Sequence, residues 1–524
     1  MAEATTRLSR RSIIIIVTAM MAALLEILDA SIVNVAIPTM MGNLGVTLDA
    51  ISWVSTGYMI SNSIILPIAA WFGSRLGRRN YFTSAIILFT LSSFMCGIAP
   101  NLLVLVIFRI FQGLAGGALL PTAQTLIQEQ FPKEKATLAM AIFGMSIMIG
   151  PALGPVLGGY LTDTIGWRAI FNINIPLGII AAILSYMYIE QNTPSAETQK
   201  KSVDWVGFGL LSLGVGCFQF ILERGQAEGW LDSTAIRWTL LFAIISTGSF
   251  IYWELRVKNP IMNLRLFKTN AVNAGAILMM SLGVILYTLT FVVPVFADHV
   301  MHLTATQTGL LFIPGSIATA ISMMLVGKFS KHFHPRTIIL VGVGIATLSV
   351  VMMTKFSTQT GPESLFFPLI FRGVGAGFLF IPILSSVTSQ FKGEELAQVN
   401  GLMNFFRQIG GSIGIAALSL LLTRFSKQNY ADLMSKVSRF NPIAARDFHQ
   451  ISTGLPVQTL SDNIGFGTAS EMSTKIVYGR VMQQAFMMSF VQLCWCIIII
   501  VILMIIPVFF MKMQRRLDTN VEAH

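Results

Sequence analysis

Charged residues are scarce in this chain. Only 11% of its 524 residues are Asp, Glu, Lys or Arg, whereas 54% are hydrophobic. A soluble domain carries roughly 25% charged residues, so the composition excludes a soluble globular protein of this length. It indicates a polytopic membrane protein instead.

Cysteine is almost absent as well. The four cysteines fall in apolar stretches and lack the spacing of metal ligands; they are Cys96, Cys217, Cys494 and Cys496. We therefore expect buried thiols, with no disulfide and no metal. A glycine-rich lysine loop for nucleotide phosphates and a nucleophile paired with a base are also missing. These absences argue against an enzyme, a cofactor and a self-contained ATP-driven pump.

Long apolar runs dominate what is present. Runs of about 18 to 25 residues can cross a hydrocarbon core of roughly 30 Å, and the sequence predicts fourteen spans. They are 13–37, 50–72, 81–99, 102–126, 137–161, 169–189, 204–223, 236–255, 270–296, 306–327, 336–354, 364–387, 397–421 and 481–510. The first run contains acids and leads into further runs, so it is predicted to stay as a span and not as a cleaved signal peptide. An even number of spans puts both termini on one side.

Basic residues identify that side, because Lys and Arg of short loops stay in the cytoplasm. One set of loops contains nearly all of them: Arg7, Arg10, Arg11, Arg75, Arg78, Arg79, Lys133, Lys135, Lys200, Lys201, Arg256, Lys258, Arg265, Lys268, Lys328, Lys331, Arg336, Lys392, Lys512, Arg515 and Arg516. The opposite short loops contain only Arg168, Arg224, Arg237 and Lys355. Both termini are therefore predicted to be cytoplasmic. The net charge of +11 is then a topology signal, and we predict no nucleic-acid partner.

The sequence also repeats itself. Gln130–Glu134 leads to Ile149–Gly154, and Gln390–Glu394 leads at the same spacing to Ile409–Gly414. A shorter echo relates Ile107-Phe108-Arg109 to Ile370-Phe371-Arg372. Both copies start on the same side of the membrane, so the repeat is parallel. Parallel six-span halves with a substrate site between them near the membrane midplane are one plan of secondary transporters.

The repeat sets the predicted domains. Spans one to six match spans nine to fourteen, which leaves spans seven and eight as an insertion. The domains are an N-terminal six-helix bundle (1–190), a linker with the inserted spans (191–269) and a C-terminal six-helix bundle (270–524). The last includes a polar segment, 424–480, predicted to lie outside between spans thirteen and fourteen. It is either a folded or partly folded excursion that offers a docking surface, or a loosely ordered loop.

Ionisable side chains within the predicted spans are few, and each costs roughly 2.5 kcal/mol or more near a helix centre. Glu26 and Asp29 lie three residues apart in the first span, on one helical face, and Arg109 lies in the fourth span. Asp29 and Arg109 are each about seven residues from the outer end of their spans, so we expect both roughly 10 Å deep. Glu26 lies about one turn deeper.

Two interpretations fit these three residues. A carboxyl group in a partly dry cavity can hold a proton at neutral pH, and a nearby arginine or an arriving cation favours its ionised form. Asp29 and Glu26 would then carry protons, and Arg109 would modulate them. Alternatively, Asp29 and Arg109 form a permanent ion pair that orients two helices, and Glu26 is hydrogen-bonded to a neighbouring helix.

Glycine and proline gather in the fifth span. They are Gly150, Pro151, Gly154, Pro155, Gly158 and Gly159. Proline kinks a helix and removes a backbone donor, whereas glycine lets a neighbouring helix come close. This span is therefore predicted to bend and to seal against a neighbour; ordinary packing through small residues is the alternative.

Several stretches resemble motifs of the EmrB-type fourteen-span drug:proton antiporters of the major facilitator superfamily. They are Leu28–Pro38 in the first span, Arg109–Gly113 with Gly116 and Gly117 in the fourth, Gly150–Gly159 in the fifth, Trp167–Gly178 at the sixth, and Asp204–Gly207 with Leu222–Gly225 in the inserted pair. The resemblance covers essentially the whole chain. It implies an all-α membrane protein with the major facilitator fold, two six-helix bundles plus two inserted spans. In that family the fifth-span motif marks exporters that exchange substrate for a cation, and the fourth-span arginine is implicated in proton transfer.

One loop departs from the superfamily pattern. After the second span the superfamily has a glycine and an aspartate ahead of Arg-x-Gly-Arg-Arg, whereas here Ala70 and Ser74 precede Arg75, Gly77, Arg78 and Arg79. In the family the acid helps to latch the two halves, so this latch is weakened or supplied elsewhere. The three arginines are predicted to form a cytoplasmic loop gate, with a role in topology alone as the alternative.

Four uncharged polar residues and one arginine complete the predicted site. The cavity candidates are Asn34, Gln112, Asn404, Arg407 and Gln408. The last three lie on one side of the thirteenth span, in the repeat position of the fifth-span motif. They would face a cavity or a gate, or else hydrogen-bond between helices.

The sequence thus predicts a proton-coupled multidrug efflux transporter of the bacterial plasma (inner) membrane that exports amphipathic drug-like compounds, cationic or neutral, by alternating access. A dedicated exporter of one metabolite, siderophore or lipid, and a non-transporting receptor or scaffold, are the alternatives. Expected partners are small molecules, protons and the lipid bilayer. Relatives often work with a periplasmic adaptor protein and an outer-membrane channel, and the sequence leaves open whether this chain does.

Overall fold

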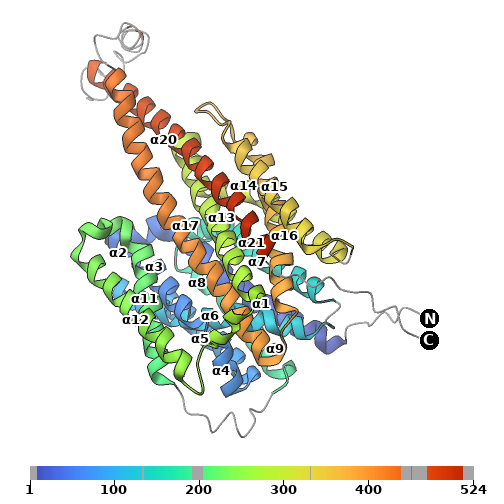
Figure 1. Cartoon of the computed structure of the whole chain (residues 1–524). Helices are drawn as coiled ribbons and strands as arrows, with labels where there is room; N and C mark the ends of the chain where they lie inside the picture. Colours follow the sequence, from blue (N-terminus) through green and yellow to red (C-terminus); the bar gives the residue numbers. More distant parts are fainter. Residues whose placement is uncertain are drawn as a thin grey trace.

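The computed structural model describes residues 9–132, 135–191, 204–330, 332–437, 446, 450 and 469–510. These residues form helices joined by turns and short loops, without a strand among them (Figure 1). The helices up to residue 188 are α1 (Arg10–Leu44), α2 (Leu48–Ile51), α3 (Trp53–Ile65), α4 (Ala69–Leu76), α5 (Arg78–Gly97), α6 (Leu102–Glu129), α7 (Ala136–Thr164), α8 (Ala169–Asn172) and α9 (Asn174–Tyr188). The later helices are α11 (Trp205–Glu228), η2 (Trp230–Asp232), α12 (Thr234–Arg256), η3 (Leu264–Lys268), α13 (Asn270–Met301), α14 (Ala305–Phe329), α15 (Pro335–Met353), η4 (Pro362–Leu365), α16 (Phe366–Thr388), α17 (Gly393–Lys436), α20 (Ala469–Leu503) and α21 (Ile505–Phe510).

Twelve helical stretches of the described residues are long and apolar enough to cross a membrane, and they match twelve of the fourteen predicted spans. The predicted span 50–72 is divided among α2, α3 and α4. Pro67, which lacks a backbone donor, lies in the second of these breaks. The predicted span 137–161 lies within the 29-residue α7. The number fourteen and the cytoplasmic termini stay predictions, and residues 1–8 and 511–524 lie outside the described residues.

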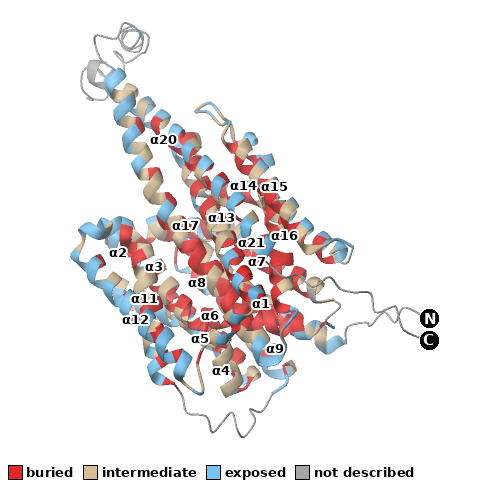
Figure 2. Cartoon of the chain, viewed as in Figure 1, coloured by how far each residue is buried: buried red, intermediate tan, exposed pale blue. Residues whose placement is uncertain are grey.

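Apolar side chains cover the outside of the helix bundle as well as its inside. Figure 2 shows buried residues concentrated along the interior helices and exposed residues along the periphery. Exposed large apolar side chains include Ile179, Ile180 and Ile183 of α9 and Ile244 and Ile245 of α12. A polar solvent would disfavour such faces, whereas lipid tails match them. The pattern is that of a multi-pass membrane protein.

Helix packing recurs between the first and the last parts of the chain. The first helix, α1, packs against α6, α7 and α9, and α13 packs in the same way against α16, α17 and α20. The contact of α3 with α6 is likewise repeated by α14 with α16. This recurrence is what the parallel repeat predicts. We call the part up to α9 the first half and the part from α13 the second half.

Contacts made by α4, α6, α7 and α11 join the halves, and α4 packs against α17. The helix α7 packs against α14 and α16, and α6 packs against α17. The inserted helix α11 contacts α3 of the first half and α17 of the second. On α11, Gln219 donates a hydrogen bond of 2.7 Å to Ser412, and Arg224 donates one of 2.5 Å to Asp49. The inserted pair is therefore tied to both halves.

The segment 424–480 begins and ends in helix. The helix α17 continues through Arg424 to Lys436, and α20 begins at Ala469. Together they extend beyond the neighbouring helices (Figure 1). Asn429 of α17 joins them by donating hydrogen bonds of 2.8 Å to Ser489 and 3.0 Å to Gln492. The rest of the predicted docking surface, residues 438–468 apart from positions 446 and 450, lies outside the described residues.

Candidate functional site

The site is built around one face of α1. Glu26 and Asp29 are three residues apart, which places both carboxylates on the same side of the helix. Both are buried, Glu26 with 5% of its surface exposed and Asp29 with none. A carboxylate away from water needs partners for its oxygens. Neighbouring helices supply them to each acid separately.

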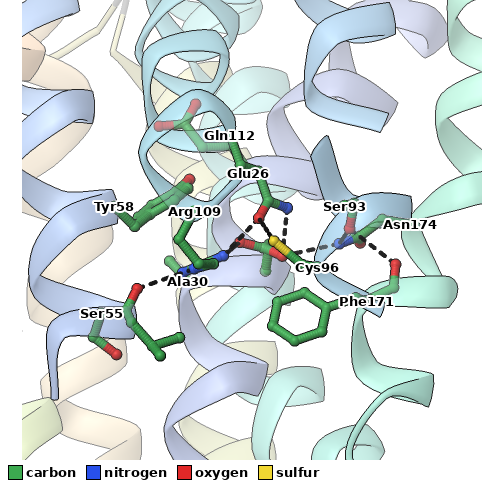
Figure 3. A network of polar contacts seen from close by, with 12 residues as sticks. Glu26, Ala30, Ser55, Tyr58, Ser93, Cys96, Arg109, Gln112, Phe171 and Asn174 are labelled. Atoms are coloured by element: carbon green, nitrogen blue, oxygen red, sulfur yellow. Dashed lines mark hydrogen bonds and ion pairs between the residues drawn. The ribbon is translucent and has the colours of Figure 1, made fainter. Parts of the chain in front are cut away.

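Asp29 lies at the centre of a hydrogen-bonded network. Figure 3 shows the surrounding side chains Arg109, Gln112 and Asn174. Nη1 of Arg109 on α6 is 2.5 Å from its Oδ2. Its Oδ1 accepts bonds of 2.9 Å from Gln112 of α6 and 2.9 Å from Asn174 of α9. Asn174 also donates a bond of 3.1 Å to Ser93 of α5. Three helices, α1, α6 and α9, therefore meet at one carboxylate, and Asn174 links them to α5.

Arg109 is fixed as firmly as its acid. The guanidinium Nε donates a bond of 3.1 Å to the carbonyl of Val54, and Nη1 donates one of 2.8 Å to Gln112. The ring of Tyr58 lies 4.2 Å from the guanidinium carbon, a distance at which an aromatic face attracts a cation. Only 1% of Arg109 is exposed. The structure therefore brings Asp29 and Arg109 together, as their matching depth predicts.

Glu26 contacts different residues. Its Oε1 accepts a bond of 2.9 Å from Asn62 of α3, and its Oε2 accepts one of 3.1 Å from the backbone N–H of Leu120 on α6. Gly116 allows this approach, since a Cβ there would be 2.9 Å from the hydroxyl of Tyr58 and 3.5 Å from Cγ of Glu26. These are the hydrogen bonds to neighbouring helices that the alternative interpretation of Glu26 expects. They hold the carboxylate in place without pairing it with a positive charge.

The glycines of the fifth-span motif lie against α1. A Cβ at Gly154 would come 2.6 Å from the Cβ of Ser31, and one at Gly158 would come 2.9 Å from Cγ1 of Ile32. Real Cβ atoms do not approach so closely, so only glycine permits this contact. A Cβ at Gly150 would likewise meet Ile27, 2.5 Å away. The glycine seam, defined as Gly150, Gly154 and Gly158, thus packs against the helix that carries both acids.

Pro155 and Gly159 of the motif face the second half. A Cβ at Gly159 would be 2.6 Å from Oγ1 of Thr306, and Pro155 lies against Gly309, both on α14. Pro151 and Pro155 both lie inside α7. The motif helix is therefore clamped between α1 and α14.

A second polar network joins the halves. Gln124 donates a bond of 2.7 Å to Asn400, which donates in turn to Thr125 at 2.9 Å and to Gln128 at 2.7 Å. Asn404 donates a bond of 2.6 Å to Gln124. All five side chains are buried. We call Gln124, Gln128, Asn400 and Asn404 the amide network; it connects α6 with α17 near the end of α6 that is predicted to be cytoplasmic.

The other candidates on α17 continue this network. Arg407 donates a bond of 2.8 Å to the hydroxyl of Tyr287 and one of 3.4 Å to Asn404. Gln408 accepts a bond of 3.4 Å from the same hydroxyl and lies 3.3 Å from the sulfur of Met59. They make the helix-to-helix bonds that the sequence allowed, and they border the contact between the halves.

Two arginines of the predicted loop gate, Arg78 and Arg79, bond within the first half. Arg78 pairs with Glu129 of α6, and Arg79 bonds to Gln191. Gly77 has a φ of 80°, a left-handed backbone that favours glycine, and it joins α4 to α5. A cavity of about 180 Å³ is lined by Arg78 and by Glu394 of α17. Arg78 and Arg79 thus leave the contact between the halves to other residues.

Among the cavity candidates, Gln112 is part of the Asp29 network, whereas Asn34 is exposed and accepts a bond of 3.3 Å from Ser55. Sequence reasoning missed Asn174, Asn62 and the first-half members of the amide network, Gln124 and Gln128. Asn174 stands in a stretch already compared with the family, so the motif offered a signal. Asn62, Gln124 and Gln128 are neutral amides in other apolar runs, and no sequence pattern marked them as functional.

Comparisons with known proteins agree with this geometry. Residues 19–415 match the Major Facilitator Superfamily. The fatty acid resistance protein FarB of Neisseria gonorrhoeae is 31% identical over 87% of this chain and 89% of its own length. The multidrug export protein EmrB of Escherichia coli K12 is 29% identical over 92% of each chain. The crystal structure of the human organic anion transporter MFSD10 covers 94% of this chain and 99% of its own, with a TM-score of 0.58 at 12% identity, and so shows the fold alone.

Proposed function

Because this chain belongs to the Major Facilitator Superfamily, we propose that it exports amphipathic drug-like compounds in exchange for protons. It is a multi-pass protein of the bacterial inner membrane and resembles proteins named multidrug export proteins over most of its length. The EmrB-type motifs support an exporter, and the position of Asp29 supports coupling to protons. Fourteen spans, cytoplasmic termini and two six-helix bundles flanking an inserted pair belong to the same proposal.

The observation that carries the proposal is the pairing of Asp29 with Arg109. Asp29 is fully buried, and Arg109, 2.5 Å away, is its cationic partner among the described residues. Charge-assisted hydrogen bonds are strong because both partners are ionised. A proton that binds Asp29 removes one of the two charges and weakens the pair. Proton binding is thereby converted into a change in how α1 is held against α6.

The glycine seam would carry that change to the contact between the halves. Ser31 lies two residues after Asp29 and packs on Gly154, so a shift of α1 at Asp29 displaces the wall of the seam. The opposite side of α7 packs on α14. Close-packed interfaces pass from one arrangement to another instead of deforming smoothly. The seam thus offers a mechanical route from protonation to rocking of the halves.

The amide network would act as the latch on the cytoplasmic side. The loop after α3 and α4 lacks the family's acid, and Arg78 and Arg79 bond within the first half. Neutral amides can break and reform their bonds without separating charges in a dry interface. In this proposal the structure represents the form in which the halves are closed on the cytoplasmic side.

One test addresses the function directly. An efflux-deficient bacterium is challenged with a panel of hydrophobic toxins, with and without this chain and with Asp29→Asn. We expect resistance to several toxins from the natural chain and none from the variant at equal membrane abundance. Resistance to one compound only would favour a dedicated exporter, and the name of FarB points to fatty acids as the first compounds to try. No resistance with either chain would favour a non-transporting scaffold, or a transporter that lacks its adaptor and channel. Co-expression of an adaptor and a channel would distinguish these two explanations.

A further inference from the structure

Arg372 is the repeat counterpart of Arg109, and the structure gives it no acid. The two arginines occupy the same place in the echo of Ile107-Phe108-Arg109 and Ile370-Phe371-Arg372. Arg109 reaches across to α1 and meets Asp29. Arg372 reaches across to α13, which packs in the second half as α1 does in the first, and meets Thr290 at 2.5 Å. Threonine stands where the first half offers a carboxylate.

The guanidinium of Arg372 has bonding capacity to spare. Both of its hydrogen bonds come from Nη2, to Thr290 and, at 3.4 Å, to the carbonyl of Leu286. Its buried Nε has no partner in the described part of the chain. No carboxylate of the described residues lies within ion-pair distance of it. The side chain is only partly buried, so a ligand can reach it.

The sequence excludes a hidden compensating acid within the predicted spans of the second half. These spans, 270–296, 306–327, 336–354, 364–387, 397–421 and 481–510, contain no Asp or Glu. They do contain Arg372 and Arg407. An unpaired cation within a membrane is costly and calls for a partner. The first half has two buried acids with one arginine, so the two halves carry opposite charge.

We propose that Arg372 binds the anionic headgroup of an amphipathic cargo, a carboxylate or sulfonate on an apolar tail. This rests on the proposed function and names one of its substrate classes. The planar fork of arginine matches the two oxygens of such a group. Phe312, whose ring is 5.3 Å from the guanidinium carbon, supplies an apolar surface beside the charge. An anionic lipid headgroup has the same chemistry, and the experiment separates it from cargo.

The test uses two compounds with the same tail and opposite fixed charges, 1-octanesulfonate and octyltrimethylammonium. Neither loses its charge at working pH, so uptake reports transport. The full chain is reconstituted in phosphatidylcholine alone, and uptake is driven by a proton gradient. We expect Arg372→Gln to lower sulfonate uptake about tenfold or more, as for loss of a hydrogen bond to a charged group. Uptake of the cation should hardly change, and Arg372→Lys should retain part of the sulfonate uptake.

Two further variants are measured beside Arg372→Gln, a second disruption of the site and a matched control. Thr290→Asp supplies the missing acid, neutralises Arg372 in place and should remove sulfonate uptake selectively even if Arg372→Gln folds poorly. Arg237→Gln, an exposed arginine at the outer end of α12, is the matched control and should change neither compound.

Each contrary result has its own meaning. Transport of the cation but not of the sulfonate by the natural chain would overturn the anion site alone, whereas transport of neither would overturn the proposed function as well. Equal loss of both compounds in Arg372→Gln and Thr290→Asp would show a structural role. Dependence on Arg372 that appears only when phosphatidylglycerol is added would make this a lipid site and overturn the cargo assignment.

Discussion

Gly154 of α7 lies directly against Ser31 of α1, so closely that a Cβ at Gly154 would be 2.6 Å from that of Ser31. Ser31 follows Asp29 by two residues, and the same motif helix touches α14 of the second half through Gly159. The fifth-span motif therefore connects the buried acid with the interface between the halves. Four predictions test this connection and the site around it.

Asp29→Asn should abolish substrate-induced proton release in vesicles. The amide keeps the size of the side chain and can still accept a bond from Arg109, but it cannot exchange a proton. Insertion and folding should be kept, as checked by membrane abundance and size-exclusion behaviour. The matched control is Asp49→Asn, which alters an exposed acid paired with Arg224. Proton-coupled transport that persists in Asp29→Asn would show that protons use another group.

Gly154→Leu should lower transport while expression is largely kept. The added side chain must push α1 away from α7, and overpacking of this kind costs about 1–3 kcal/mol. Transport rate and thermal stability are measured for this variant and for Gly344→Leu, since a Cβ at Gly344 has no neighbour within 4 Å. If bulky changes at all three seam glycines leave transport intact, the seam does not carry the motion.

Asn400→Leu should loosen the latch. It removes three hydrogen bonds at once. Oε1 of Gln128 loses its donor, whereas Nε2 of Gln128 keeps its bond to Thr388 and Oε1 of Gln124 keeps its bond from Asn404. Each unsatisfied buried group costs about 1–3 kcal/mol. Thr122 lies about one turn before Thr125 on α6, farther from the predicted cytoplasmic end of that helix. A cysteine introduced there should then react faster with a membrane-impermeant maleimide added from the cytoplasmic side. Gln390→Leu is the control, because Gln390 follows α16 by two residues and its side chain donates a bond of 3.1 Å to the carbonyl of Ser386 in that same helix. Unchanged reactivity in Asn400→Leu would place the latch elsewhere.

Glu26→Gln should weaken transport of cationic cargo more than that of neutral cargo. Glu26 is buried and makes no ion pair among the described residues, so its charge is available to a cation, and low dielectric strengthens such attraction. The expected loss for a cation is roughly tenfold, as for a hydrogen bond to a charged group, with little loss for a neutral compound of the same shape. Equal loss for both would assign Glu26 to the proton path or to the contact with Asn62.

The all-helical class, most of the spans and the charged residues of the site could be predicted from the sequence. Apolar runs are long, and a buried charge is so costly that Glu26, Asp29 and Arg109 stand out within them. The helix break at Pro67 was not resolved from composition, because an apolar run reads the same whether it is one helix or several. The helical continuation beyond Arg424 was also missed, since polar helices that pack on each other lack the apolar signal of a span.

The sequence by itself determined that this is a membrane protein, that it contains an internal repeat, and which charged side chains within the spans need a partner. Only the tertiary structure decided their partners: Arg109 for Asp29, Asn62 and the Leu120 backbone for Glu26, Ser31 for Gly154, and, among the described residues, Thr290 in place of an acid for Arg372. The physical reason is that the free-energy cost of burying a charged side chain can be judged from that residue and the apolar run around it. A hydrogen bond or a close contact needs two residues, and the sequence does not show which two meet. Those pairs form between helices far apart in the chain, and the neutral amides of the latch show their importance only once both partners are in place.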